Sequence, residues 1–315
     1  MVDFGADDPF AGGAAKLKEH YGIEVPVSAV RAVTEAHGAA MLASQKQKSD
    51  WPEGWERVGL PVLIAEMDGS MLPVVETAAP GTGAVPVDRR KTRTVSWKEA
   101  RLALVHEPGS VTPIFGGTMG SVEEAGQRLA VCALKAGMGH QTKIHGMGDG
   151  AVWVSEQMEA QFGAQADYLV DFYHLSEYLS AAGEVIAPQE GKEKKVWLEE
   201  KQDWLKDNRW KDILKALQPF VEAADRSDSE APVRVCFRYI SNHSDFLDYQ
   251  GALAAGLPIG TGEIESAHRY VFQKRLKLPG AWWKEENLNK MIALRELRAN
   301  GGWEEYWNDL DQKAA

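Results

Sequence analysis

The chain has 315 residues, with 35 Lys and Arg against 46 Asp and Glu, so its formal net charge at pH 7 is −11. Hydrophobic residues make up 44% and charged residues 26% of the chain, ordinary globular values that exclude a wholly disordered protein. No apolar run approaches the ~20 residues that span a bilayer, and the two cysteines, Cys132 and Cys236, exclude a disulfide framework and a Cys-only zinc site. The acidic, Gly-rich N-terminus is unlike a signal peptide, so we expect a cytoplasmic protein, and the acidic balance by itself argues against nucleic acid as a partner.

The first predicted segment, residues 1–59, is small and mostly helical. Residues 1–13 indicate a flexible leader, and helical patterns follow over 14–22 and 28–38 with a short turn between them. Two short helices so closely connected are compatible with a DNA-binding helix-turn-helix, and equally with a helical hairpin packed on the main domain. Residues 41–59 are polar and punctuated by Trp, as in a linker.

A different pattern begins at residue 60 and continues to residue 183. Short runs rich in Val, Leu and Ile predict buried strands, and amphipathic stretches predict helices. The predicted strands lie within residues 61–71, 95–107, 143–154 and 165–175, and a helix covers 120–137. The first two predicted strands follow each other without a helix between them, and the later strands alternate with helices. This order predicts an α/β domain around a mixed sheet.

The remaining residues divide into a charged insertion, 184–244, and C-terminal helices of the core, 245–315. Residues 184–230 alone contain 12 acidic and 9 basic side chains, with Trp197 and Leu205 among the apolar residues at helical spacing. We therefore expect a mostly helical insertion with a large solvated surface.

Three carboxylates stand out because each lies beside a predicted element of the core. Asp68 ends the first strand, Asp149 follows a later strand, and Glu265 opens a helix in the sequence GLPIGTGEIESAHR. Taken singly, either aspartate is typical of an Asp-Gly turn, and the glutamate is typical of a helix first turn. Taken together, clustered carboxylates require a divalent cation to neutralise them, and oxygen ligands favour two Mg²⁺ or Mn²⁺ ions. Such a centre supports phosphoryl transfer with two metals.

Asp171 and His174 form a fourth feature, at the junction of a predicted strand and a helix. They stand three residues apart in the sequence DFYH, downstream of the second aspartate. A lone pair of this kind is a weak signal, because a histidine hydrogen-bonded within the core explains it as well.

Several motifs together resemble those of bacterial insertion-sequence transposases of the Kra-type group, which are related to Mutator-like DDE transposases. In chain order they are DG, GDGAVWV, DFYHLSEYL, a charged helical block, GLPIGTGEIESAHR and QKRLKLPGAWW. The resemblance runs from about residue 24 to the C-terminus. It implies a ribonuclease H-like mixed sheet that is flanked by helices and interrupted by a mostly helical insertion.

The resemblance also implies which residues carry the chemistry. It maps the catalytic, metal-binding acids to Asp68, Asp149 and Glu265. The sequence Gly-Thr-Gly at 260–262 sets this register, which selects Glu265 instead of Glu263. The D-x-x-H motif maps to Asp171 and His174, which we expect to position DNA or the metal-bound aspartate.

Local charge differs in sign from the net charge in two segments. Residues 268–284 carry five basic side chains and no acid, and residues 88–101 carry six basic side chains and two acids. Both favour phosphate contacts, although each is also typical of a solvated face. The candidate DNA-binding residues are Arg269, Lys274, Arg275 and Lys277 in the first segment, and Arg89, Arg90 and Lys91 in the second. His268 shares a helix face with Glu265 and is a candidate to orient that carboxylate or a phosphate.

The sequence thus predicts a Mg²⁺- or Mn²⁺-dependent DDE transposase that hydrolyses DNA at element ends and joins the freed 3′-hydroxyl to target DNA. We expect no membrane partner and, by resemblance, a homodimer or higher oligomer on DNA. One alternative is a ribonuclease H-like nuclease without strand transfer. Another is an inactive, domesticated transposase that binds DNA. The presence of all three acids argues against it, whereas the N-terminal region, shorter than in relatives and so resembling a fragment, argues for it. A glycosidase with paired carboxylates is disfavoured by the basic helix.

Overall fold

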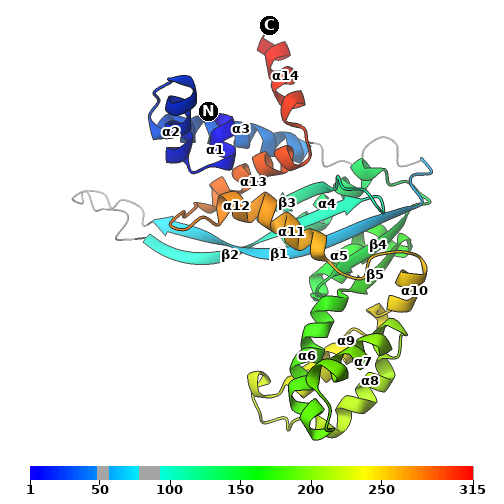
Figure 1. The fold of residues 1–315 in the computed structure, drawn as a ribbon. Coiled ribbons are helices and arrows are strands. Elements are labelled where there is room, and N and C mark those ends of the chain that lie inside the picture. Colours follow the sequence, from blue (N-terminus) through cyan, green and yellow to red (C-terminus); the bar gives the residue numbers. More distant parts are fainter. Residues whose placement is uncertain (48–56, 78–92, 315) are drawn as a thin grey trace. The chain divides into compact units, whose positions relative to one another are not determined.

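The computed structural model of the protein describes residues 1–47, 57–77 and 93–314 (Figure 1). The chain divides into two compact units. The first unit contains Met1–Leu60, Met67–Thr142 and Glu263–Ala315, and the second contains Pro61–Glu66 and Lys143–Gly262. No helix in the described part of the chain is long and apolar enough to cross a lipid bilayer.

Five strands form one sheet in the order β3-β2-β1-β4-β5. They are β1 (Val62–Thr77), β2 (Arg93–His106), β3 (Ile114–Thr118), β4 (Lys143–Gly148) and β5 (Ala166–Val170). The pairs β1–β4 and β4–β5 are parallel, whereas β2–β3 is antiparallel. This mixed sheet with flanking helices confirms the predicted α/β class and is consistent with a ribonuclease H-like fold.

The helices take up most of the described chain. Those of the first unit are α1 (Val2–Asp7), α2 (Phe10–Tyr21), α3 (Val27–Gln47), α4 (Val122–Ala136), α11 (Gly262–Ala267), a π-helix (His268–Gln273), α12 (Lys274–Leu276), α13 (Glu285–Ala299) and α14 (Trp303–Ala314). Those of the second unit are α5 (Val152–Phe162), α6 (Phe172–Gln189), α7 (Lys194–Lys206), α8 (Trp210–Leu217), α9 (Pro232–Asn242) and α10 (Tyr249–Ala254). Single 3₁₀ turns cover Gly163–Gln165, Gln218–Phe220, Asp228–Glu230 and Ser244–Phe246.

In the first unit, helices cover both faces of the sheet. A Cβ atom at Gly116 of β3 would lie 2.9 Å from Cys132 Sγ of α4, and one at Gly117 would lie 2.9 Å from Ile292 of α13. Because successive residues of a strand point to opposite faces, α4 and α13 pack on opposite sides of β3. Figure 1 shows α11, α12 and α13 along β1 and β2 within this unit.

The N-terminal residues differ from the predicted leader and linker. Residues 1–13 belong to α1 and α2, because Val2 and Ala6 bury their side chains in the core of the first unit. The predicted second helix is longer, since α3 continues to Gln47, and residues 48–56 lie outside the described residues. The helix α3 packs on α13, where a Cβ at Gly38 would lie 2.6 Å from the carbonyl oxygen of Lys290. This packing favours the helical hairpin over a free helix-turn-helix.

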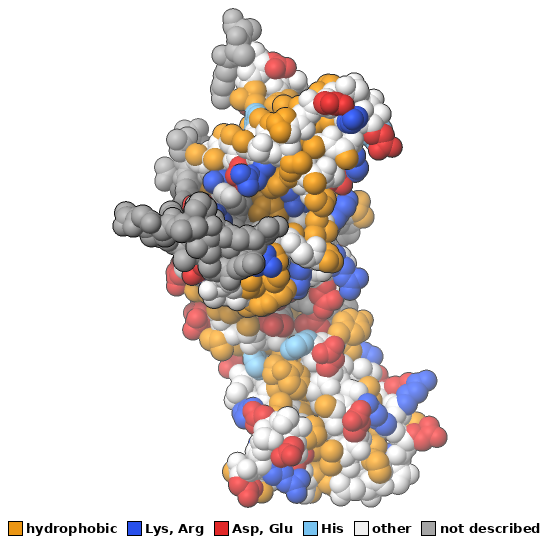
Figure 2. All heavy atoms as spheres, turned by 90° about the vertical axis from the view of Figure 1, so that its left-hand side faces the viewer, with side chains coloured by type: hydrophobic (Ala, Val, Ile, Leu, Met, Phe, Trp, Pro, Cys, Tyr) orange, Lys and Arg blue, Asp and Glu red, His pale blue; other side chains and the backbone are white. Residues whose placement is uncertain are grey.

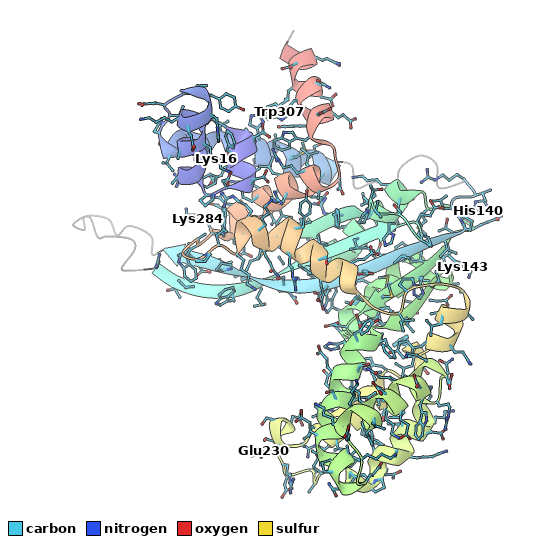
Figure 3. All side chains as sticks on the ribbon, in the orientation of Figure 1. Lys16, His140, Lys143, Glu230, Lys284 and Trp307 are labelled. Atoms are coloured by element: carbon cyan, nitrogen blue, oxygen red, sulfur yellow. The ribbon has the colours of Figure 1, made fainter. Side chains whose placement is uncertain are left out.

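The C-terminal helix α14 joins the same layer of helices. Its Trp307, labelled in Figure 3, places its ring centroid 4.9 Å from that of His37 in α3. The hydroxyl of Tyr306 lies 2.7 Å from His37 Nδ1. These contacts fix the start of α14 beside α3.

The second unit is built around α6, whose apolar side chains face β4, β5 and the helices α7 to α9. The predicted start of an insertion at residue 184 lies inside α6, because Leu179, Ala182 and Ile186 continue one buried face across it. Charged side chains of these helices pair with one another, as Lys192 does with Glu200 at 2.9 Å. Figure 2 shows acidic and basic side chains interspersed over this unit, in the lower part of the view.

The outer edge of β3 is covered by polar side chains instead of another strand. Alternate backbone N–H groups donate to one face of α13: Phe115 to Asn300 (2.8 Å), Gly117 to Glu296 (3.1 Å) and Met119 to Asn289 (2.9 Å). An uncovered strand edge exposes N–H and C=O groups that recruit other strands. Here the helix supplies the acceptors that a neighbouring strand would otherwise provide.

Glu296 is the buried member of this set. Its other carboxylate oxygen accepts a hydrogen bond from Gln45 Nε2 of α3 at 2.8 Å. Burial raises the pKa of the Glu296 carboxyl above its usual value, while Arg128 and the Gly117 N–H act in the opposite direction. The carboxyl group therefore binds its proton more tightly in the folded than in the unfolded chain.

We expect Glu296→Gln to change how stability depends on pH. The raised pKa stabilises the folded wild-type protein. This stabilisation is complete below the pKa of the unfolded chain, ~4.3, and is lost as the pH rises through the higher pKa of the folded chain. The glutamine does not titrate, so the free energy of unfolding of the variant minus that of the wild type should increase from pH 4 to pH 7 in urea titrations. As a control, Glu296→Ala should lower stability by about 1–3 kcal/mol, because the Gly117 N–H loses its acceptor. A difference between Gln variant and wild type that is constant with pH would contradict this account.

Candidate functional site

Asp68 lies in β1, and the imidazole of a buried histidine contacts its carboxylate. Its Oδ1 accepts a hydrogen bond from the Gly69 N–H at 2.7 Å, and its Oδ2 lies 3.2 Å from Nε2 of His268. The Asp68 side chain is 33% exposed, whereas that of His268 is 4% exposed. The carboxylate therefore has one side held within the first unit and another side open. His268 contacts this aspartate, and not Glu265 as its position in the sequence suggested.

His268 is oriented by the π-helix that begins with it. In this π-helix, buried Arg295 of α13 donates from Nη2 to the carbonyl of Tyr270 (2.6 Å) and from Nε to that of Val271 (3.2 Å). A π-helix is rare and is often found at functional sites. The two donated hydrogen bonds satisfy carbonyl oxygens of this less regular turn.

The two glutamates of α11 have different surroundings. Glu263 places Oε2 2.9 Å from Nε2 of His106, at the end of β2. Glu265 is exposed, and no residue within 1–47, 57–77 and 93–314 forms a hydrogen bond or ion pair with its side chain. Of the two, Glu265 thus has the carboxylate that is free to bind a ligand.

Asp149 lies in a turn that three side chains of the second unit hold in place. The hydroxyl of Tyr239 donates to the Asp149 carbonyl at 2.6 Å, and Nε2 of His243 lies 2.8 Å from the Gly150 carbonyl. The hydroxyl of Tyr168 accepts from the Gly150 N–H at 3.3 Å. Burial raises the pKa of Tyr239, so this hydroxyl remains a donor at neutral pH. The turn is therefore fixed from β5 and from α9.

Sequence reasoning missed Tyr239 and His243. Tyr239 lies in α9 and His243 directly follows this helix as its C-cap, four residues later. Their rings contact each other at a centroid distance of 4.3 Å. The Tyr239 ring also stacks on Tyr178 of α6, with centroids 4.2 Å apart. The available signal was the i, i+4 spacing of two polar aromatic residues at the end of a predicted helical insertion.

Asp171 has a buried carboxylate, and both of its oxygens accept hydrogen bonds from the chain. It begins α6 as its N-cap, where Oδ1 accepts from the N–H groups of Tyr173 (2.5 Å) and His174 (2.8 Å). Its Oδ2 accepts from the Thr261 N–H at 2.6 Å and from the Thr261 hydroxyl. Its side chain is buried. Asp171 therefore ties the start of α6 to the loop that leads into α11.

Position 260, in the loop that leads into α11, leaves no room for a side chain. A Cβ atom at Gly260 would lie 2.5 Å from the ring of Tyr173.

His174 is partly exposed and lies 3.9 Å from the carboxylate of Glu177, with its ring edge-on to that of Tyr178. Of the predicted pair, only His174 has a surface open to a ligand.

The basic residues after Glu265 do not share one environment. Arg269, Lys274 and Lys277 are exposed along the helix. Arg275 is buried, and the prediction that it contacts DNA is not supported: its guanidinium lies 4.8 Å from the ring of Trp283 and donates to the Gly5 carbonyl at 3.1 Å. Burial lowers the pKa of Arg275 to about 10, so it stays charged at neutral pH. Arg89, Arg90 and Lys91 lie outside the described residues.

The three predicted acids carry the oxygen donors that a hard divalent cation prefers. Asp68, Asp149 and Glu265 offer carboxylate oxygens, which suit Mg²⁺ or Mn²⁺. In the first unit, the Asp68 carboxylate is partly exposed and that of Glu265 is exposed. In the part of the chain that the structure describes, no three His, Cys, Asp or Glu side chains group closely enough to bind one ion. The ligand chemistry therefore fits, whereas a complete coordination group is absent from the described residues.

Comparison with known proteins places the chain in a family. Residues 138–309 match the model of the uncharacterised protein family UPF0236, and the chain therefore belongs to this family. The match includes Asp149, the Asp171–His174 pair and Glu265. A search of curated proteins gave no match.

We expect Asp171→Ala to lower the free energy of unfolding by about 2–3 kcal/mol, because the substitution removes an N-cap and the acceptor of both Thr261 donors. Asp171→Asn should cost less, since its carbonyl oxygen still accepts at one of the two places. Urea unfolding followed by circular dichroism measures both. An Asp171→Ala variant as stable as the wild type would show that these hydrogen bonds contribute nothing.

Proposed function

We propose that this member of UPF0236 is a DNA transposase that acts by metal-dependent phosphoryl transfer. In this proposal Asp68, Asp149 and Glu265 hold two Mg²⁺ or Mn²⁺ ions, the substrate is DNA at the ends of a mobile element, and the protein works as a dimer or higher oligomer on that DNA. The proposal extends the resemblance of the sequence motifs and is supported by the geometry of each unit.

The register of β1 against β4 carries the proposal. Glu66 pairs with Met147, an offset of 81 residues that all five pairs of this parallel ladder share. Asp68 and Asp149 are separated by the same 81 residues, so each follows the last pair by two residues. In open α/β sheets, ligands bind beyond the carboxyl ends of parallel strands, and Asp149 directly follows the end of β4. Two aspartates without a shared role have no reason to keep the register of the ladder.

The residues around the acids support distinct roles. His268 steadies Asp68 from its buried side, as a neighbouring group orients a metal ligand. The Tyr239 hydroxyl and His243 hold the backbone of the Asp149 turn, which limits the positions that the Asp149 carboxylate can take. Glu265 follows the loop tied down by Asp171.

Bound divalent ions would supply activation of water and stabilisation of charge on the attacking and leaving oxygens. The chain itself would orient the DNA. Arg269, in the π-helix that continues from α11, and Lys277, which follows α12, are exposed cations. We infer that they bind the phosphates flanking the scissile bond. The same carboxylates would serve hydrolysis first and attack by the freed 3′-hydroxyl second.

We expect Asp68→Asn, Asp149→Asn and Glu265→Gln each to reduce Mn²⁺-dependent nicking of DNA that ends in the element's terminal sequence. Loss of one metal ligand should cost several kcal/mol of transition-state stabilisation, equivalent to about 1,000-fold or more in rate. Circular dichroism should show folded variants, since none of these substitutions changes the size of a side chain.

Glu263→Gln is the matched control for the third acid. It lies two residues from Glu265 on the same helix, and its carboxylate is engaged by His106, so nicking should continue at close to the wild-type rate. Full activity of Glu265→Gln together with loss in Glu263→Gln would place the catalytic acid at 263 instead. A strand-joining assay with the same DNA distinguishes a transposase from a nuclease, because only a transposase links the 3′ end to a new target.

Salt dependence separates the surface cations from the buried one. We expect Arg269→Gln to reduce the slope of log affinity for duplex DNA against log salt by about 0.9, the value for one lost phosphate contact. Arg275→Gln should leave the slope unchanged and lower the free energy of unfolding by about 1–3 kcal/mol. Fluorescence anisotropy and urea unfolding measure the two quantities. A reduced slope for Arg275→Gln with unchanged stability would contradict the packing described here.

A further inference from the structure

A pocket of about 330 Å³ lies in the first unit, between the π-helix, α13 and the start of α14. It is lined by Asp7, Tyr270, Lys274, Arg295, Arg298 and Trp303. Its volume is within the range of about 300–1,000 Å³ that small-molecule sites occupy. The lining differs from that of an apolar site, because half of it is cationic.

The charges of this pocket leave a net positive surface. Asp7 pairs with both Arg295 and Arg298, and Arg298 also pairs with Asp3. Nε of Arg298 is buried and has no hydrogen-bond partner among the described residues. Lys274 is exposed and forms no ion pair in the described part of the chain. An anionic group in the pocket would pair with Lys274, beside the positive charge of Arg298.

Two aromatic side chains form the other walls. Tyr270 is 48% exposed and precedes Lys274 by four residues, so the two share one face of the helix. Trp303 carries the guanidinium of Arg298 over its ring, 4.2 Å from the centroid. Aromatic rings beside cations are the combination with which proteins bind unpaired nucleotides, where bases stack and phosphates are neutralised.

We infer that this pocket binds one nucleotide of an unpaired DNA strand. Lys274 and Arg298 bind its phosphate, and its base stacks on Tyr270. The choice of DNA rests on the proposed function, because Lys274 continues the row of exposed cations that starts at Arg269, beside Glu265. The pocket thus serves as an anchor for the strand beyond the proposed site of cleavage.

The test uses the dinucleotide pdTdT, which is long enough to fill the pocket and too short to follow the row of cations. Ligand-observed NMR titration gives its Kd for the full chain. We expect Lys274→Gln and Tyr270→Leu each to weaken binding about 10-fold. Lys135→Gln is the matched control, because it removes the same charge from an exposed lysine of α4, outside the pocket, and should leave the Kd unchanged.

Three results would overturn the inference. The first is wild-type affinity in both pocket variants, and the second is an equal loss in Lys135→Gln. The third is inorganic phosphate binding as tightly as pdTdT, which would indicate a simple anion site. Thermal unfolding of each variant verifies its fold. Asp68→Asn should bind pdTdT like the wild type, so a failure of the proposed cleavage activity and a failure of the pocket give different results.

Discussion

The hydrogen bonds from Arg295 to the carbonyls of Tyr270 and Val271 connect most of the features described for the first unit. Arg295 is buried, so its charge requires acceptors, and it finds them in the π-helix and in Asp7. The π-helix in turn sets the direction of His268 toward Asp68 and of Tyr270 and Lys274 toward solvent. A single buried cation thus links the N-terminal helix, the proposed metal ligand and the pocket.

The net charge of −11 argues against DNA as a partner, but the charges are paired differently in the two units. In the second unit, charged side chains of α6 to α9 are largely engaged with each other, as in the pair of Lys194 and Glu184 at 2.7 Å. In the first unit, exposed cations after Glu265 have no acid in their own segment to pair with. Acidic residues that are paired internally repel a polyanion less than the sum suggests, whereas free cations attract it.

The sequence patterns predicted β2 and α4 well, because α4 has one buried apolar face and β2 ends in an apolar run. The strand predicted within 61–71 is longer, since β1 continues to Thr77, and the one predicted within 143–154 is shorter, since β4 ends at Gly148 and α5 begins at Val152. The N-terminal residues 1–13 were predicted as a leader, since Gly and Asp dominate them and their burial depends on a partner, α13, nearly 300 residues away. Arg275 was assigned to the surface for the same reason: its burial beside Phe10 and Trp283 is a tertiary contact. The π-helix has no local signature, because its stability comes from Arg295 in another helix.

The sequence motifs singled out the three acids of the proposed site, but they gave no indication of the residues that contact these acids. Asp68, Asp149 and Glu265 were recognisable by position, while the groups that contact them, Tyr239 among them, come from elements with no motif. Hydrogen bonds to backbone carbonyls leave no pattern in a sequence, since any carbonyl accepts equally well.

The side chains of α13 that cover the edge of β3 have a consequence for assembly. With Asn289, Glu296 and Asn300 occupying alternate N–H groups, a strand from a second chain cannot extend the sheet on that side. Any symmetric assembly of this protein must therefore use another surface. Conversely, a shortened chain that ends before residue 285 would leave three N–H donors at that edge without acceptors, and such chains would tend to join edge to edge.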